Sequence, residues 1–347
     1  MIKLFHLKHV DWLDSQLIYH ALPRLNQEGL LILAPSSPYV CIGYHQNLEQ
    51  EVDLDYCREH NIPVFRREVG GGAVFLDGDQ LFYQLVLHKN HPLAGGSKAD
   101  FYQRLLQPVV DTYQELGIDA RFRPVNDIIT AEGRKIAGTG AAEINDHIIL
   151  VGNLIADFDY ETMTKVLRVP DEKFRDKVFK SLTENLTTIK KELGSLPTWD
   201  EMAVPLIHHY RNLLGPLGES QISDQIRKKA DALKAEYLND EWLFLKRRSL
   251  SHRDIKIATD VNIIQHVYKA PGGLMKANYE LKDEKIQSLS LSGDYFCYPS
   301  DVDRQIEKAL EGKNLKEVSG ILEEYYFHHS VETPGINPSD WAKVILG

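Results

Sequence analysis

Residues 66–84 read RREVGGGAVFLDGDQLFYQ, and residues 134–155 read RKIAGTGAAEINDHIILVGNLI. The first stretch places Arg66, Arg67 and three consecutive glycines between two β-like runs. Consecutive glycines allow the backbone to turn sharply and to bring its N–H groups against a ligand. Arginines beside such a turn can bind a phosphate or carboxylate through paired hydrogen bonds, and Lys135, at the start of another β-like run, adds a point charge. Together the two stretches predict an anion-binding site held in a β-sheet.

The composition restricts the classes of function. With 347 residues, 43% hydrophobic and 26% charged, the chain has the makeup of a globular enzyme of about two domains. Its formal net charge of −10 argues against a general nucleic-acid or membrane-surface binder. No stretch approaches the roughly 20 apolar residues of a membrane span, and Asp11 and Asp14 come too early for a secretory signal. The three scattered cysteines, Cys41, Cys57 and Cys297, are typical of reduced thiols, so we expect a cytoplasmic protein.

Hydrophobic periodicity predicts a mixture of strands and helices. Apolar runs bounded by Pro, Gly, Asn or Asp predict strands at 30–35, 38–45, 63–69, 72–77, 81–88, 121–130, 134–144 and 147–158. Asn145-Asp146 is typical of a hairpin turn between the last two. Helical spacing marks residues 11–25, 99–116 and most of 159–237.

The composition changes near residues 238–250, LNDEWLFLKRRSL. Beyond this point we expect strands at 255–261, 273–281 and 285–293, with Gly272-Gly273 as a turn, and helices at 300–310, 315–326 and around Trp341. The fold class is therefore predicted to be α+β. We expect a large domain with mixed sheets flanked by helices over 1–243, and a small α+β domain over 250–347.

Four short blocks of sequence are informative when their order and spacing are considered together. Arg-Arg-x-x-Gly-Gly-Gly-x-Val with a following Asp occupies 66–77, and Asn-Asp followed by Lys-Ile-x-Gly occupies 126–138. Gly-x-His-Gln-Asn occupies 43–47, and LSGDYF occupies 291–296. In this order and spacing, the chain resembles the lipoate–protein ligase A family of the biotin/lipoate ligase superfamily, nearly from end to end. The last part resembles the family's C-terminal accessory domain.

The resemblance implies a two-step reaction with ATP and Mg²⁺, in which lipoate becomes lipoyl-AMP and a lysine of a lipoyl-carrier protein then displaces AMP. It makes Lys135 the catalytic residue, between the lipoyl carbonyl and the phosphate, because a positioned positive charge lets two anions meet. Asp127 is a candidate for binding the incoming lysine or Mg²⁺. The residues implied to bind lipoate or lipoyl-AMP are Arg66, Arg67, Gly70, Gly71, Gly72, Val74, Asp77, His45, Asn47, Asn126, Asp127, Ile136, Gly138, Thr139, Gly152 and Leu154.

Several positions depart from the family pattern. Leu76 and Val151 stand where histidines are common, Tyr44 stands at a frequent arginine, and Thr183 and Asn185 replace arginines of the adenylate-binding segment. Each arginine lost removes five hydrogen-bond donors and a charge. These departures indicate a divergent ligase. Its acceptor could be a lipoyl domain of a 2-oxoacid dehydrogenase or a specialised carrier resembling the glycine-cleavage H protein, for example in sulfur metabolism, a choice that rests on analogy.

Two other functions stay open from the sequence. An octanoyl or lipoyl transferase of the same superfamily would use a cysteine nucleophile or a carrier-bound acyl group, but no cysteine lies between 57 and 297. A non-catalytic lipoate-binding regulator would fit the missing histidines and arginines. Single residues also have plainer interpretations. The glycines could form an ordinary hairpin turn, and Asn126-Asp127 could form a turn of its own. One of the two arginines could be structural, and for His45 a structural role and a ligand contact are equally favoured.

Overall fold

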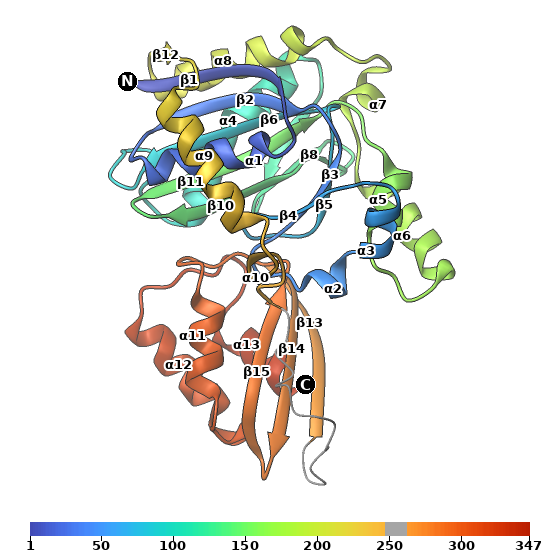
Figure 1. Ribbon diagram of the computed structural model, residues 1–347, viewed down its shortest axis with the longest axis vertical. Coiled ribbons are helices and arrows are strands. Elements are labelled where there is room, and N and C mark those ends of the chain that lie inside the picture. Colours follow the sequence, from blue (N-terminus) through green and yellow to red (C-terminus); the bar gives the residue numbers. More distant parts are fainter. Residues whose placement is uncertain (247–261) are drawn as a thin grey trace.

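The central element of the computed structural model, which describes residues 1–246 and 262–347, is a six-stranded mixed sheet (Figure 1). Its strand order is β10 (Thr139–Ile144), β11 (His147–Ile155), β6 (Gln80–His88), β2 (Gly29–Pro35), β1 (Ile2–Val10) and β12 (Leu217–Glu219). β1 pairs in parallel with β2 and β12, whereas β2, β6, β11 and β10 pair antiparallel. β2 is buried at every position, as expected of a central strand covered on both faces.

Helices cover both faces of this sheet. α1 (Asp14–Arg24) and α9 (Asp224–Tyr237) pack together on one face, and α4 (Lys98–Glu115) and α8 (Trp199–Leu214) on the other. Their starts are specified locally, since the Ser97 side chain caps α4 and Thr198 with Glu201 forms a capping box on α8. The sheet is thus the middle layer of a sandwich.

Two small sheets and several short helices lie along one edge of this body (Figure 1). One small sheet has the order β4 (Val64–Arg66), β3 (Tyr39–Ile42), β5 (Val74–Leu76), and the other β7 (Ala120–Arg123), β8 (Asp127–Thr130), β9 (Lys135–Ala137). The helices here are α2 (Leu48–Glu51), α3 (Leu54–Glu59), α5 (Tyr160–Val166), the longer α6 (Glu172–Asn185) and α7 (Ile189–Leu193), whereas α10 (Asp240–Leu243) lies near the junction with the C-terminal part. These two sheets hold the glycine run and Lys135, respectively.

The C-terminal part has its own sheet and its own core. β13 (Asn262–Ala270), β14 (Gly273–Lys282) and β15 (Lys285–Gly293) form an antiparallel meander, and α11 (Val302–Leu310), η1 (Leu315–Glu317), α12 (Val318–His328) and α13 (Pro338–Leu346) accompany it. A separate hydrophobic cluster, centred on the fully buried Trp341, unites them. Figure 1 shows this part below the large one, with the β13–β14 turn and the start of α11 near the junction.

The α+β class is confirmed, and most expected elements are present. The expected strands 121–130 and 134–144 are each split in two, into β7 and β8 and into β9 and β10. β1, β12 and β13 were not anticipated, because β1 mixes buried and exposed positions irregularly and β12 has three residues. In β13 the apolar Ile263 and Val267 are exposed, so polar and apolar residues do not alternate in the sequence. The expected strand 255–261 lies outside the described residues. Within the described ranges, no helix is both long and apolar enough to cross a bilayer.

Candidate active site

A cavity of about 420 Å³ opens between the large sheet, both small sheets and the C-terminal part. Its size is typical of a small-molecule site. From the large part it is lined by Gln16, Tyr19, Cys41, Arg67, Val69, Gly71, Gly72, Ala73, Val74, Leu76, Phe82, Gln84, Asn126, Asp127, Lys135, Gly138, Thr139, Gly140, Val151, Gly152 and Asn153. From the C-terminal part it is lined by Lys269, Pro271, Gly272, Gly273, Asp294 and Phe296.

The lysine singled out in the sequence lies in this cavity and is paired with an acid. Lys135 begins β9, and its Nζ lies 2.8 Å from Oδ1 of Asp127 on the neighbouring strand β8. Arg123 lies 2.8 Å from the other carboxylate oxygen. Burial opposes ionisation of Asp127, but the charge of Lys135 and the hydrogen bonds of both cations lower its pKa below the usual value. The pair therefore places a fixed ammonium group, held by a carboxylate, on the cavity wall.

The glycine run forms the adjoining wall, and Arg67 holds its shape. Arg67 donates to the carbonyls of Gly70 at 2.7 Å and Gly72 at 2.9 Å, and to the carbonyl of Cys41. Gly71 has a φ of +89°, a conformation in which side chains are strained, and a Cβ there would also crowd Phe296 and the Arg67 guanidinium. Arg67 thus shapes the loop as well as lining the cavity.

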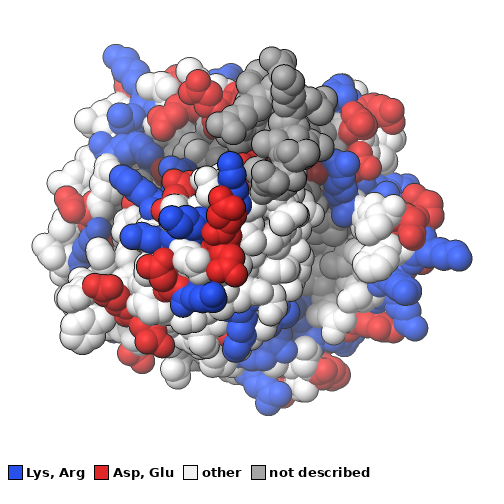
Figure 2. Space-filling model, turned by 90° about the horizontal axis from the view of Figure 1, so that it is seen from below, with Lys and Arg blue, Asp and Glu red and all other residues white. Residues whose placement is uncertain are grey.

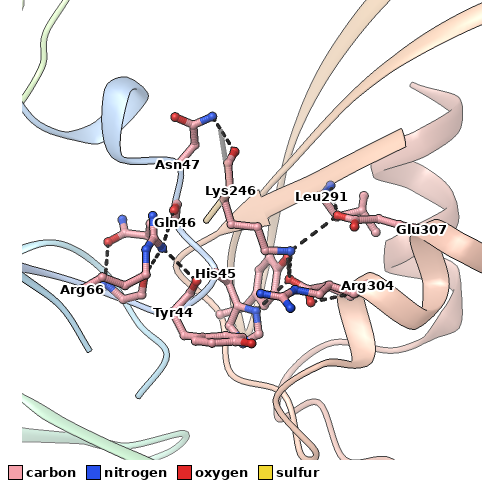
Figure 3. Close-up of polar contacts among 12 residues, drawn as sticks. Tyr44, His45, Gln46, Asn47, Arg66, Lys246, Leu291, Arg304 and Glu307 are labelled. Carbon is pink, nitrogen blue, oxygen red and sulfur yellow. Dashed lines mark hydrogen bonds and ion pairs between the residues drawn. The ribbon is translucent and has the colours of Figure 1, made fainter. Parts of the chain in front are cut away.

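Arg66 lies outside the cavity, although the sequence grouped it with Arg67. Neighbouring residues on a strand point to opposite faces, and Arg66 is fully buried. Its guanidinium donates to five backbone carbonyls, those of Gly43, Tyr44, Gln46, Trp242 and Leu243. Figure 3 shows Arg66 beside Tyr44 and Gln46. All three guanidinium nitrogens donate, so its position is that of a structural arginine joining loop 43–46 to the end of α10.

His45 and Asn47 also lie away from the cavity, at the junction with the C-terminal part. His45 Nδ1 lies 2.8 Å from Oδ2 of Asp303 on α11, and Asn47 donates to the carbonyl of Lys246. Lys246 Nζ lies 2.7 Å from the same Asp303 oxygen and 3.5 Å from Glu307 (Figure 3). These groups form a buried cluster of charges that joins the two parts, which we call the junction cluster: His45, Lys246, Asp303 and Glu307.

The remaining expected site residues divide between the cavity wall and the layer behind it. Val74, Asn126, Gly138, Thr139 and Gly152 line the cavity. Asn126 is tied down, since its side chain donates to the Thr139 carbonyl at 2.7 Å and its own carbonyl accepts from the Thr139 hydroxyl. The others are not among the lining residues: Gly70, Asp77, Ile136 and Leu154.

Packing explains why Ile136, Leu154 and Gly70 do not line the cavity. Ile136 and Leu154 are fully buried in the core beneath the cavity. A Cβ on Gly70 would collide with the Tyr295 carbonyl, so this glycine faces the C-terminal part. Asp77 accepts from the backbone N–H of Asp79, and burial raises its pKa to about 6.

The sequence missed two groups of lining residues. One comes from α1, β3 and β6, where Gln16, Tyr19, Cys41, Phe82 and Gln84 surround one end of the cavity. The other is the C-terminal group, brought to the site by the β13–β14 turn and by the LSGDYF block. The LSGDYF block was part of the resemblance, so the sequence did mark the second group as informative. However, no short-range sequence pattern predicts that this block lies beside the glycine run.

The residues at the cavity do not form a resident magnesium site. Among the described residues there is no group of three His, Cys, Asp or Glu side chains able to hold a metal ion. Asp127, the expected candidate, already pairs with two cations. Its carboxylate is therefore suited to positioning an ammonium group rather than to binding a metal on its own.

The departures from the family pattern have local explanations. Tyr44 lies at the junction, with the Arg304 guanidinium 5.5 Å from its ring centroid. Leu76 and Val151 line the cavity and make its wall more apolar. Thr183 and Asn185 bond to carbonyls of their own helix α6, so neither donates to the cavity.

The fold and the cavity define a class: an α+β protein with a cavity lined by a glycine loop and a lysine, and by residues of its C-terminal part. The family model described as Lipoyl protein ligase A/B catalytic domain matches residues 12–211, well over half of the chain. The chain belongs to this family. The accessory part extends beyond the matched region.

Similar proteins agree with this assignment. The chain is 25% identical to the lipoate-protein ligase LplJ of Bacillus subtilis over 308 residues, which is 87% of each chain. A solved lipoate protein ligase of Thermoplasma acidophilum, from a study with its E2 lipoyl domain, has a TM-score of 0.64 and 28% identity over 72% of this chain and 98% of that one. A lipoate-protein ligase A bound with ATP has a TM-score of 0.59 and 25% identity over 70% and 98%. LipL1 of P. falciparum, solved with lipoate, shares the fold over all of this chain and 99% of its own, with a TM-score of 0.70 at 15% identity.

Proposed function

We propose that this protein is an ATP-dependent lipoate–protein ligase that converts lipoate to lipoyl-AMP and then lipoylates a lysine of a carrier protein. The observation that supports this most directly is the wall shared by Lys135 and the glycine loop within one cavity. The cavity also has an apolar stretch, formed by Val74, Leu76 and Phe82, that suits an aliphatic chain. A basic wall and an apolar wall together suit a ligand that has a carboxylate and a hydrocarbon chain, such as a fatty-acid-like molecule.

In the first step, the lipoate carboxylate attacks the α-phosphorus of ATP and pyrophosphate leaves. Two negative groups must approach each other, and Lys135 supplies the positive charge between them. The backbone N–H of Gly72 can add a donor where charge develops, whereas that of Gly71 donates to the Tyr295 carbonyl. Magnesium would come with the nucleotide, as the substrate MgATP.

In the second step, the amine of the acceptor lysine attacks the acyl carbon and AMP leaves with the bonding electron pair. An incoming lysine arrives as an ammonium ion and loses one proton to water before it attacks, and a second proton passes to water as the amide forms. Asp127, kept ionised by its cationic partners, is the carboxylate at the cavity that can bind this ammonium group. No protein nucleophile is needed in either step.

The transferase alternative gains one observation, since Cys41 lines the cavity. However, burial raises the pKa of the Cys41 thiol, although Arg67 opposes this effect. A thiol with a raised pKa is a poor nucleophile at neutral pH, because the thiolate is the reactive form. Cys41 is therefore better explained as part of the apolar wall.

The acceptor belongs to the proposal as well. The relative from Thermoplasma acidophilum was studied with an E2 lipoyl domain, which supports a lipoyl domain as acceptor here. A carrier resembling the glycine-cleavage H protein is the other possibility that we propose to test. Seen from the C-terminal side, the visible surface mixes both signs of charge, so it suggests no strongly acidic or strongly basic partner (Figure 2).

We further propose that the boundary between the two domains falls at residues 243–250, and that the small domain moves when lipoyl-AMP forms. The proposal is supported by the C-terminal residues in the cavity wall, because an acceptor lysine must pass them to reach the acyl carbon. Motions of this kind commonly open or close an active site.

One experiment separates the proposed function from its alternatives. Purified protein is incubated with ATP, Mg²⁺ and lipoate in the absence of any acceptor, and pyrophosphate is measured. A ligase releases pyrophosphate in proportion to lipoyl-AMP formed, whereas a cysteine transferase or a binding protein releases none. Mass spectrometry of candidate carriers added afterwards then identifies the acceptor.

A further inference from the structure

The C-terminal part contributes a cation to the cavity. Lys269 is the next-to-last residue of β13, and Ala270 separates it from the Pro271-Gly272-Gly273 turn. Both Lys269 and this turn line the cavity. Lys135 and Arg67 line the same cavity from the large part. The cavity wall therefore has three basic side chains, and one of them belongs to the accessory domain.

The turn that places Lys269 is firmly held. The Gly272 backbone N–H donates to the Gly335 carbonyl at 2.8 Å, and a Cβ at Gly272 would collide with Pro334. On the other side, Asp294 accepts from the Leu274 N–H, and the Gly71 N–H donates to the Tyr295 carbonyl at 3.1 Å. The glycine loop and the β13–β14 turn are thus fixed to the same C-terminal framework, residues 293–296.

The other two cations of the cavity wall are already engaged. Arg67 donates to the carbonyls of Gly70, Gly72 and Cys41, and Lys135 pairs with Asp127. Lys269 has an exposed side chain and makes no ion pair or side-chain hydrogen bond with any of the residues described. The wall also has two acidic groups, and both have partners. Asp127 pairs with Lys135 and Arg123, and Asp294 accepts from the Leu274 N–H. Lys269 is thus the basic group of the wall that has no partner among the described residues, whereas Lys135 is exposed in part and held by Asp127.

We propose that Lys269 binds the phosphate of the acyl-adenylate, so that the accessory domain completes the anion site of the ligase. This inference rests on the proposed function and names a further phosphate-binding residue for it. An ammonium group on a long flexible stem suits a phosphate at the rim of a site, because it contacts the anion as a point charge. It also couples the proposed movement of the small domain to the formation of lipoyl-AMP.

Calorimetry with two ligands tests the inference. Lipoyl-AMP has a phosphate and lipoate has none, so Lys269→Ala is expected to weaken lipoyl-AMP binding on the order of tenfold and to leave lipoate binding unchanged. Lys269→Arg keeps the charge and is expected to restore most of the affinity. Lys282→Ala is the matched control, because Lys282 is an exposed lysine at the far end of the neighbouring strand β14.

The outcomes are distinguishable. Wild-type protein that binds lipoyl-AMP, with Lys269→Ala binding it equally well, would overturn the inference alone. A loss of lipoate binding equal to the loss of lipoyl-AMP binding would also overturn it, since the role of Lys269 would then be structural. Wild-type protein that neither binds lipoyl-AMP nor releases pyrophosphate would overturn the proposed function, and this inference with it.

Discussion

Lys135 Nζ and Asp127 Oδ1 lie 2.8 Å apart across two neighbouring strands at the cavity wall. The lysine is partly exposed, so a ligand can reach it, while the carboxylate fixes its position. Asp127 is kept ionised by its cationic partners, and the two residues together form an oriented dipole rather than a free charge. This arrangement suits a site in which a negative group arrives first and a positive group second.

Lys135 is expected to be essential for adenylate formation. Lys135→Ala should lower the rate of lipoate-dependent pyrophosphate release about 10²–10³-fold, the typical cost of removing one positioned electrostatic group. Lys135→Arg should be nearly as poor, because a planar guanidinium cannot replace a compact ammonium between two reacting groups. Circular dichroism checks that both variants are folded, and near wild-type turnover of Lys135→Ala would refute the assignment.

Asp127 is expected to matter more for transfer than for adenylation. Asp127→Asn leaves the Lys135 charge in the cavity but removes the carboxylate that can bind an incoming ammonium group. We expect transfer from preformed lipoyl-AMP to a carrier lysine to fall on the order of 10²-fold or more, with a smaller change in pyrophosphate release. Arg123→Ala, which removes the other partner of Asp127 at a half-exposed position, is the control. Equal losses in both steps would contradict this division.

Two adjacent glycines should respond differently to substitution. Gly71→Ala puts a side chain at a φ of +89° and should destabilise the protein by about 1–3 kcal/mol. A Cβ at Gly72 meets only ordinary contact, 3.7 Å from Cβ of Asp294, so Gly72→Ala should stay within about 0.5 kcal/mol of the wild type. Thermal denaturation compares the two, and equal melting temperatures would contradict the strained loop conformation.

The junction cluster should make attachment of the small domain sensitive to acid. Burial lowers the pKa of His45 against the opposing effect of Asp303, and His45 and Lys246 lower the pKa of Asp303 although burial opposes them. For both groups the unfolded chain binds more protons at low pH. The stability contributed by these two groups is therefore present at neutral pH, declines as the pH falls below about 6.5, where free histidine protonates, and declines further below about 4. Burial raises the pKa of Glu307, so this carboxyl acts in the opposite direction at low pH.

Asp303→Asn tests the cluster directly. Asp303 is fully buried, and its loss leaves the buried Lys246 with Glu307 as its remaining carboxylate partner in the cluster, so the free energy of unfolding should fall by about 3–5 kcal/mol. The acid sensitivity between pH 7.5 and 5 should grow at the same time, because His45 loses the carboxylate that opposes the lowering of its pKa by burial. Asp283→Asn, at an exposed turn with a φ of +50° that asparagine also adopts, is the control. Small-angle scattering should show a more extended particle for Asp303→Asn, and an unchanged profile with an unchanged melting curve would contradict the role of the cluster.

The sequence predicted the central elements because their signals are local. The glycine run between two strands, the strand that starts at Lys135 and the hairpin at Asn145-Asp146 all follow from short-range rules of backbone conformation. These features brought Arg67, Asp127 and Lys135 to one site. Elements without strong periodicity, such as β1 and the three-residue β12, gave no such signal.

The rest depends on contacts between distant segments. Arg66 and Arg67 look equivalent in the sequence, and only the carbonyls of Trp242 and Leu243, about 176 residues away, show which one is structural. His45 faces Asp303 across 258 residues. Lys269 and Phe296 reach the cavity through the packing of one domain on another, which no local rule describes.

We expect this one protein both to make lipoyl-AMP and to pass the lipoyl group to a lysine. The most direct test is a two-stage reaction with the wild-type protein: pyrophosphate is measured with ATP, Mg²⁺ and lipoate, and a lipoyl domain is then added and weighed by mass spectrometry. We predict lipoate-dependent pyrophosphate release before the acceptor is added, followed by a mass increase of one lipoyl group on a single lysine, both lost in Lys135→Ala. An acceptor that becomes lipoylated without ATP, or no pyrophosphate release under any condition, would contradict the account.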